Sequence, residues 1–334
     1  MTHKVCIIVP IYNVSKYIER CARSLFEQTF NDIQYVFVDD CSPDNSMAIL
    51  EKVLDEYIER KKHSTIFRHL KNEGQAVTRS DGLNLSKSDY ILYVDSDDYI
   101  DVKTVELMYT KAINENADIV VCDFLLDWGN VTKMFYQPFD PNNIEYTKLL
   151  LDTKAQPGLP NKLIKSSLFF NYNISFFRDI DMGEDYSTTP RLAYYALKIA
   201  KVDLPLYHYV QTNNNSYTKS FSEKSIKDVV SAINILECFF TQVPDSEVFT
   251  KSLMEGKLRK KIMMLMLSKS DYRQKIANLF LETNEIIPTV RLKIEERITI
   301  YLANKKLFKL LDVFLAVYYR LVGFSQILKG RTKK

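Results

Sequence analysis

A repeating alternation of strand-like and helix-like segments dominates about the first 125 residues of the chain. Val5–Val9 is a continuous apolar run, as expected for a strand buried on both faces of a parallel sheet. Further strand-like segments follow at Tyr35–Val38, Thr65–Leu70, Tyr90–Val94 and Ile119–Phe124. Apolar residues at helical spacing lie between them, within 14–25, 47–58, 76–85 and 102–113. Repeated βα units of this kind predict an α/β fold with a doubly wound, mostly parallel sheet and helices on both faces.

The remainder of the chain follows a different pattern. Between about 126 and 215 we expect a hairpin near Gly129-Asn130, short helices within 145–170, and a helix after Asp185 that Pro190 either starts or kinks. Beyond about residue 222 the pattern is helical throughout. The sequence therefore predicts a sheet-containing domain at 1–218, a helical region at 219–303 and a tail at 304–334.

The cysteines and the first residues bear on the compartment. The five cysteines are widely spaced and form no C-x-x-C pair, which favours a reduced, cytosolic setting over a disulfide framework. The apolar run near the start stops at Pro10 without a small-residue cleavage site, which favours a strand over a signal peptide. We therefore expect a cytoplasmic protein.

Positive charge is concentrated at the C-terminal end. The formal net charge is +3, but residues 304–334 contain eight Lys or Arg and one Asp, a local net charge of +7. The first 303 residues therefore carry about −4, from 3 − 7. This gives no electrostatic reason to expect nucleic-acid binding by that part of the chain.

The tail also contains apolar residues at helical spacing. Asp312 and Arg320 interrupt them, so the apolar stretch is shorter than the roughly 18 uninterrupted residues of a spanning helix. One interpretation is a basic amphipathic helix on an anionic membrane surface, on the inner face of the plasma membrane. The other is a helix packed on the body or on a partner subunit, as in a homo-oligomer. The apolar residues are Leu307, Leu310, Leu311, Phe314, Val317, Tyr318 and Leu321.

Acidic residues follow the fourth predicted strand. In a doubly wound sheet, ligands bind beyond the carboxyl ends of the strands, which is where Asp95-Ser96-Asp97-Asp98 lies. Alternate side chains of an extended segment share a face, so Asp95 and Asp97 are expected to point the same way. Two such carboxylates bring hard oxygen ligands to Mg²⁺ or Mn²⁺. The alternative is a solvated acidic turn that caps the next helix.

Three weaker patterns lie elsewhere. Asp39 and Asp40 end the second strand, where a carboxylate can accept hydrogen bonds from a nucleobase or ribose, or simply form a turn. Tyr12, just after the first strand, offers an aromatic face for a base, although tyrosine there is more often a packing residue. Glu184-Asp185 lies at a predicted helix start, where acids also complement the helix dipole.

Several common catalytic motifs are missing. No G-x-G-x-x-G follows a strand, and there is no G-x-x-x-x-G-K-[ST], G-x-S-x-G or H-E-x-x-H. The chain has four histidines, so a histidine-rich metal site is not indicated. The sequence therefore favours chemistry based on carboxylates and a divalent metal.

Taken together, these patterns resemble the family 2 glycosyltransferases, which have the GT-A fold and mostly act with inversion. The resemblance covers about residues 4–218 and rests on seven motifs in the family's order. They are I-I-V-P-I-Y-N (7–13), V-D-D-C-S-P-D (38–44), N-E-G-Q-A-V-T-R-S (72–80), Y-I-L-Y-V-D-S-D-D (90–98), N-K-L-I-K (161–165), G-E-D-Y (183–186) and L-Y-H-Y (206–209).

The resemblance implies roles for particular residues. Asp185 matches the general base of the family's E-D motif, and Asp95 and Asp97 match the D-x-D that holds ribose and the metal-diphosphate. The residues implied on the donor side are Pro10, Ile11, Tyr12, Asp39, Arg79, Asp95 and Ser96. The residues implied on the acceptor side are Asn161, Lys162, Glu184 and His208.

The resemblance also implies an activity. We expect an inverting, Mn²⁺- or Mg²⁺-dependent hexosyltransferase that moves a sugar from a nucleotide-sugar donor, by default a UDP-sugar. The acceptor would be a hydroxyl of a carbohydrate or lipid-linked saccharide in bacterial surface polysaccharide synthesis. A sugar-nucleotide pyrophosphorylase would instead have a glycine-rich basic loop where this chain has 10–13. A non-catalytic scaffold would not need the carboxylates at 95, 97 and 185.

Overall fold

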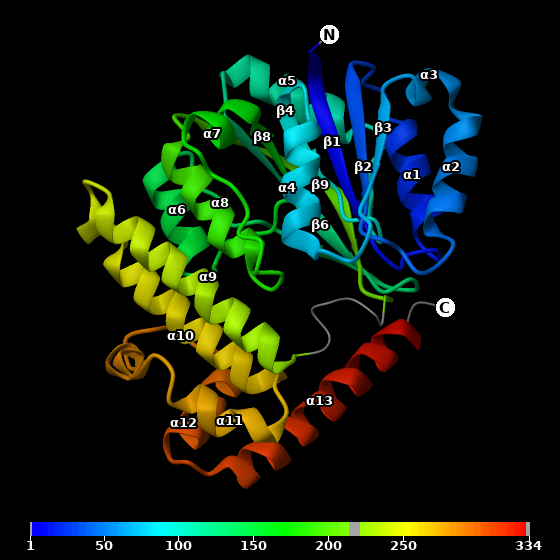
Figure 1. Cartoon of the computed structure of the whole chain (residues 1–334). Coiled ribbons are helices and arrows are strands. Elements are labelled where there is room, and N and C mark those ends of the chain that lie inside the picture. Colours follow the sequence, from blue (N-terminus) through cyan, green and yellow to red (C-terminus); the bar gives the residue numbers. More distant parts are fainter. Residues whose placement is uncertain (1, 214–220, 332–334) are drawn as a thin grey trace. The chain divides into compact units, whose positions relative to one another are not determined.

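The computed structural model describes residues 2–213 and 221–331, with side chains described up to residue 321 (Figure 1). The chain divides into two compact units. The first unit consists of Met1–Leu150 and Lys154–Asn213, and the second of Leu151–Thr153 and Asn214–Lys334. The predicted boundaries after residues 218 and 303 stay predictions.

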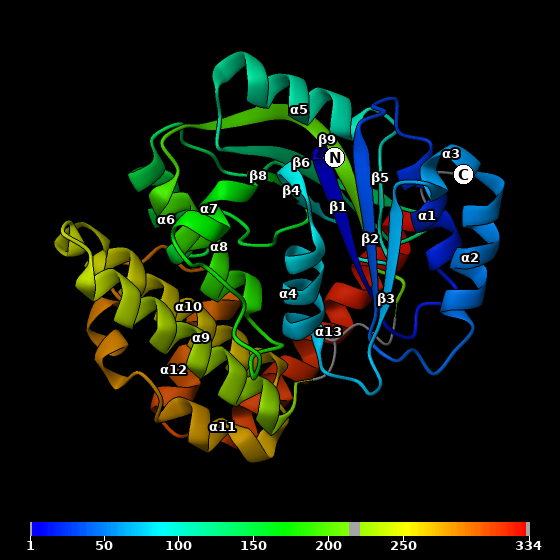
Figure 2. The same cartoon turned by 45° about the horizontal axis from the view of Figure 1, so that its top comes forward.

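A mixed, mostly parallel sheet forms the centre of the first unit (Figure 2). Its strand order is β3-β2-β1-β4-β8-β6-β9-β5, and β7 pairs with β6. The pairs β2–β3, β1–β2, β1–β4 and β6–β9 are parallel, whereas β8 runs antiparallel to both of its neighbours. The strands are β1 (His3–Ile11), β2 (Ile33–Asp39), β3 (Ser64–Arg68), β4 (Ser88–Tyr93), β5 (Tyr99–Ile100), β6 (Ile119–Asp127), β7 (Thr132–Phe135), β8 (Lys162–Lys165) and β9 (Ile199–Val210).

Helices cover both faces of this sheet, as predicted. Alternate side chains of β1 enter opposite cores: Val5 and Ile7 pack with residues of α1, α2 and α5, while Cys6 and Ile8 pack with residues of α4, α6, α7 and α8. The helices are α1 (Ile18–Phe26), α2 (Ser46–Glu56), α3 (Ile58–Lys61), α4 (Gln75–Leu85), α5 (Thr104–Glu115), α6 (Asn143–Leu151), α7 (Ser166–Asn171) and α8 (Glu184–Tyr195).

Three strands of the first unit were not predicted. Strand β8 has the sequence KLIK, and its two lysines are not typical of a strand inside a sheet. Strand β5 has only two residues, which is too short for a recognisable pattern. The long strand β9 carries exposed residues in its middle, which breaks the apolar run. The predicted hairpin near Gly129-Asn130 is confirmed as β6 paired antiparallel with β7. Pro190 lies inside α8 and does not start it.

The second unit is helical in its described part, apart from one bridge between Phe221 and Ser268. Phe240, Leu258 and Ile262 belong to its buried interior. No helix in the described ranges is long and apolar enough to cross a membrane. The helices are α9 (Glu223–Gln242), η2 (Ser246–Phe249), α10 (Thr250–Leu267), α11 (Ser270–Ala277), η3 (Leu281–Ile286), α12 (Ile294–Asn304) and α13 (Phe308–Arg331).

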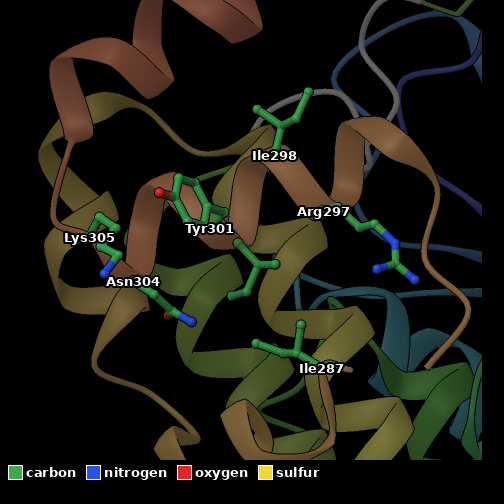
Figure 3. A pocket seen from close by; sticks show the side chains of 7 residues that line it. Ile287, Arg297, Ile298, Tyr301, Asn304 and Lys305 are labelled. Atoms are coloured by element: carbon green, nitrogen blue, oxygen red, sulfur yellow. The ribbon is translucent and has the colours of Figure 1, made fainter. Parts of the chain in front are cut away.

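A pocket of about 530 Å³ lies in the second unit (Figure 3). Three isoleucines form much of its lining, and Arg297 donates hydrogen bonds to the carbonyls of Leu292 and Val290. The guanidinium of Arg297 therefore hydrogen-bonds to backbone carbonyls of the second unit itself. The lining residues are Ile287, Arg297, Ile298, Ile300, Tyr301, Asn304 and Lys305.

Candidate active site

The sequence motifs at 7–13, 38–44 and 90–98 meet at one edge of the sheet. Strands β1, β2 and β4 are neighbours and parallel, so their carboxyl ends lie together. In the β1–β2 register Ile11 lies opposite Asp39, and the backbone N–H of Val94 donates to the carbonyl of Ile8. Asp95 lies two positions after the end of β4. Pro10, Ile11, Asp39 and the D-x-D segment therefore lie along one edge of the sheet.

Arg79, on α4, is the electrostatic centre of the site. Its side chain is 1% exposed and contacts three carboxylates. One terminal nitrogen lies 2.8 Å from Asp95 Oδ1, and the other lies 2.8 Å from Glu184 Oε1 and also donates to Asp185 Oδ1. The hydroxyl of Tyr93 donates to the carbonyl of Arg79 at 3.3 Å. A buried guanidinium therefore joins the D-x-D segment to the start of α8.

The three carboxylates around Arg79 outnumber its one positive charge. Burial raises the pKa of Glu184 to about 8, and repulsion from Asp185 adds to this effect while Arg79 opposes it. Burial also raises the pKa of Asp185, again opposed by Arg79. The side chain of Asp185 is 21% exposed against 8% for Glu184. Of the two acids, Asp185 is therefore the more accessible.

The acidic segment after β4 is held by the end of β9. The hydroxyl of Tyr207 donates to Asp98 Oδ2 at 2.5 Å, and the backbone N–H of Val210 donates to Asp98 Oδ1 at 2.7 Å. Asn213 donates to Asp97 Oδ2 at 2.8 Å. Burial raises the pKa of Asp98 well above its usual range, and repulsion from Asp97 and then Asp95 adds to the effect. The segment 206–209 of β9 was expected on the acceptor side, but these contacts with Asp97 and Asp98 were not predicted, because they span more than a hundred residues.

These acids fit a divalent cation. Carboxylate oxygens are the hard ligands that Mg²⁺ and Mn²⁺ prefer, and a cation would relieve the mutual repulsion of Asp95, Asp97 and Asp98. No group of three His, Cys, Asp or Glu side chains in the described ranges is arranged to hold a metal on its own. In the structure Asp95 pairs with Arg79 and Asp97 accepts a hydrogen bond from Asn213.

The predicted donor-side residues differ in accessibility. Pro10, Ile11 and Asp39 lie in or at the ends of β1 and β2, where Asp39 Oδ1 accepts from the backbone N–H of Ser42 at 2.9 Å. Tyr12 is 47% exposed, so its ring is available to a ligand. Ser96 is buried.

Asp40 connects the donor side to α4. It accepts from the backbone N–H groups of Glu73 and Gly74 at 2.7 and 3.0 Å, and from His69 at 2.7 Å. Gly74 has φ +92°, and a Cβ there would meet Asp181 Oδ1 at 2.3 Å. This packing positions the start of the helix that carries Arg79. The sequence shows Asp40 and His69 but gives no sign that they are linked.

Two of the predicted acceptor-side residues are buried. Asn161 donates to the carbonyl of Cys122 at 2.8 Å, and the ammonium of Lys162 donates to the carbonyls of Gln156 and Gly158 and to Asn161 Oδ1 at 2.9, 2.5 and 2.7 Å. Burial lowers the pKa of Lys162 to about 7. Both side chains hold the loop 156–159, whose Leu159 N–H lies 3.4 Å from Asp185 Oδ2. Asn161 and Lys162 are therefore connected to Asp185 through this loop.

His208 lies on β9 beside the acidic segment. Its ring stacks on Tyr99 with centroids 4.2 Å apart, and the Arg20 guanidinium lies 4.1 Å from the centroid of the Tyr99 ring. Burial lowers the pKa of His208. The Tyr99 hydroxyl donates to Asp127 Oδ2 at 3.1 Å. His208 is thus part of an aromatic cluster next to the site and does not contact Asp185 in the structure.

The chain is similar in sequence to known glycosyltransferases. A family model described as glycosyl transferase family 2 matches residues 6–178, slightly more than half of the chain. The chain is 29% identical over 240 residues to a poly(ribitol-phosphate) beta-glucosyltransferase of Bacillus spizizenii, a match that covers 69% of this chain and 37% of that protein. The chain thus spans little more than a third of that relative's length.

Two solved structures share the fold. Staphylococcus aureus TarS 1–349 has a TM-score of 0.69 at 19% identity and covers 95% of this chain and 91% of its own; it has also been solved with UDP and with UDP-GlcNAc. The mannosyltransferase PcManGT from Pyrobaculum calidifontis, in complex with GDP-Man and Mn²⁺, has a TM-score of 0.57 at 15% identity and covers 95% and 87%. These likenesses confirm the expected GT-A fold with its helical C-terminal region. With the family model over half of its length and the family's acidic motifs joined at one sheet edge, the chain belongs to glycosyl transferase family 2 and is a glycosyltransferase.

Proposed function

We propose that this protein is an inverting, metal-dependent hexosyltransferase that uses a UDP-sugar. Its acceptor is a hydroxyl of a carbohydrate or lipid-linked saccharide in surface polymer synthesis. The observation that carries the proposal is the buried Arg79, which contacts both Asp95 of the D-x-D segment and Asp185, the proposed base. The UDP and UDP-GlcNAc complexes of TarS and the relative that acts on poly(ribitol-phosphate) support the donor and acceptor classes.

Asp185 is the proposed general base. The acceptor hydroxyl attacks the anomeric carbon, the bond from that carbon to the diphosphate oxygen breaks, and the hydroxyl proton passes to Asp185. Arg79 and the Leu159 N–H each engage one carboxylate oxygen and so fix the orientation of Asp185. Arg79 also favours the ionised form, which is the form a base needs.

Glu184 has a different proposed role. With a pKa raised to about 8, it holds a proton at neutral pH, so it is a poor base but a good hydrogen-bond donor. When Glu184 is protonated, the positive charge of Arg79 is balanced by Asp185 and Asp95 alone. We assign Glu184 to orienting the acceptor or the base.

The metal and the donor complete the proposed site. Asp97, with Asp95, would hold Mn²⁺ or Mg²⁺, which would offset the negative charge that develops on the leaving diphosphate. Tyr12 and Asp39 would contact the nucleoside. Pro10, Ile11 and Ser96 would form the backbone segments that line the nucleoside site. Asn161 and Lys162 position the loop beside Asp185, and His208 borders the acceptor side.

A donor screen tests this function. Purified protein is incubated with Mn²⁺ and a panel of UDP-, GDP- and CMP-sugars, and nucleotide release is measured with and without oligosaccharide acceptors. Release of UDP that depends on one UDP-sugar and is abolished by Asp185→Asn supports the proposal. Release of a nucleoside triphosphate in the presence of pyrophosphate would favour the pyrophosphorylase alternative, and ligand binding without any turnover would favour the scaffold.

A further inference from the structure

Helix α13 carries an exposed apolar stripe, which we call the outer stripe. It consists of Leu310, Val313, Val317 and Leu321, whose side chains are 53, 61, 51 and 65% exposed. Spacings of three and four residues place them on one face of the helix. Apolar residues occur singly on most protein surfaces, but a contiguous row of this kind usually marks an interaction site.

The other side of α13 is already occupied. Leu311 and Leu315 are buried, and Asp312 pairs with Arg273 of α11. The hydroxyl of Tyr319 donates to the carbonyl of Met266 at 3.3 Å. These contacts fix which face of α13 turns inward, so the apolar core of the second unit does not use the outer stripe.

The exposed charged residues of α13 and of the turn before it are all basic. Lys305, Lys306, Lys309 and Arg320 are exposed, and within the described ranges none of them forms an ion pair with an acid. The only acid between residues 305 and 321 is Asp312, which Arg273 neutralises. The outer stripe is therefore bordered along one flank by basic residues, while on the other side of the stripe Tyr318 donates a hydrogen bond to Glu295 of α12.

We propose that the outer stripe docks this protein onto the surface of an anionic lipid bilayer, with α13 lying in the plane of the interface. Such helices bury an apolar face at the level of the headgroups and add attraction between basic residues and anionic lipid. A second copy of the chain fits less well, because a symmetric pairing of the same face brings its cations together. The proposal concerns binding alone and does not depend on the sugar donor or acceptor.

Vesicle co-sedimentation of the full-length chain tests the proposal. Wild type is expected to pellet with phosphatidylglycerol-containing vesicles and to pellet far less with pure phosphatidylcholine vesicles. Val313→Gln with Val317→Gln should lower the partition coefficient by about tenfold or more, since two buried valines are lost from the interface. The matched control is Leu70→Gln with Leu197→Gln, two exposed leucines of the first unit, which should leave binding unchanged.

Charge is tested separately. Lys309→Glu with Arg320→Glu should weaken binding to anionic vesicles by about tenfold or more and reduce its salt dependence, because each basic residue adds roughly fivefold. Lys52→Glu with Lys251→Glu changes the net charge equally at other exposed positions and should have little effect.

Three results would overturn the proposal. The first is that the wild type does not bind anionic vesicles. The second is that the valine double variant binds them as well as the wild type does. The third is that the wild type does not bind vesicles and forms a dimer in sedimentation velocity, whereas the valine double variant is a monomer. The last result would assign the outer stripe to a second copy. The substituted side chains are exposed, so thermal unfolding should change little; if the double variant unfolds, Leu321→Gln replaces it.

Discussion

The Nη1 atom of Arg79 lies 2.8 Å from Glu184 Oε1, although the two residues are 105 positions apart in the chain. The same guanidinium contacts Asp95 and Asp185, so one cation is shared by three acids inside the protein. The cluster would carry a net charge of −2 if all three acids were ionised. Protonation of Glu184, the least exposed of the three, relieves this repulsion.

Glu184→Gln should make the protein's stability less sensitive to pH. The pKa of Glu184 is raised to about 8 in the folded state, against roughly 4.3 in an unfolded chain. Between these values the native state binds more protons than the unfolded state, so the wild-type free energy of unfolding falls as pH rises. The variant lacks this titration and should lose less stability between pH 5 and pH 8.5, by on the order of 2 kcal/mol. Urea unfolding at both pH values measures the difference, and equal losses in both proteins would contradict the raised pKa.

Asp97→Asn should weaken metal-dependent donor binding. The substitution keeps the shape and the hydrogen-bond geometry toward Asn213 but removes a negative charge from the proposed metal site. UDP affinity in the presence of Mn²⁺ should fall by about tenfold or more, whereas the weaker affinity with EDTA should be the same in both proteins. Calorimetric titration of UDP with and without Mn²⁺ measures this. Unchanged affinity in the variant with Mn²⁺ would reject Asp97 as a ligand.

Arg79→Met should move the acid limb of the pH profile of kcat/KM to higher pH. Arg79 lowers the pKa of Asp185, and Asp185 must be ionised to accept a proton. Loss of a neighbouring cation typically raises a carboxyl pKa by about one unit or more. The limb should therefore shift upward by that amount in Arg79→Met and by less in Arg79→Lys, which keeps the charge but not the planar fork.

A purely structural role for Arg79 would give a different result. Both variants would then lose activity without any shift of the limb, since the ionisation of the base would be unaffected. Circular dichroism and thermal unfolding of each variant show whether enough folded protein remains for the profile to be interpreted.

The sequence predicted the parts of the site that follow the strand-end rule. Asp39 and Asp95 follow apolar strands in a βα array, and parallel topology alone brings such positions to one edge. It also predicted the helical second unit, because the 3.6-residue period there is uninterrupted by strand signals. In both cases the deciding information is local.

The remaining contacts depend on long-range packing. Tyr207 and Asn213 reach the acidic segment across 109 and 116 residues, and no local pattern marks them as partners. Lys162 would be expected at a surface, but three oxygen acceptors compensate its burial inside the sheet. Arg79 was expected to line the donor pocket, which stays a prediction, but its contacts with the acids were not predicted. Side-chain partners of this kind follow from the tertiary structure and have no periodic signature.

Asp185→Asn should abolish most of the transfer while donor binding persists. Of the acids around Arg79, Asp95 belongs to the proposed metal site, where a neutralised carboxylate is a poor proton acceptor, and Glu184 is held protonated near neutral pH. Asp185, whose side chain is 21% exposed, is the remaining carboxylate of the three. Loss of a general base typically costs about 10²–10⁴-fold in rate. Because Asn keeps the shape of the side chain, the contact with Leu159 and the fold should remain.

A radiolabelled-sugar transfer assay, with UDP affinity measured in parallel, separates this role from a binding defect. We expect kcat to fall by at least about 10²-fold in Asp185→Asn with UDP affinity near that of wild type. Glu184→Gln, at the adjacent position, is the matched control. This variant should bind acceptor less well and have a higher KM. It should keep measurable turnover, because the substitution removes a carboxyl group that is already protonated. If Asp185→Asn transfers sugar normally, or if Glu184→Gln loses turnover instead, the base lies elsewhere and the assignment of Asp185 is wrong.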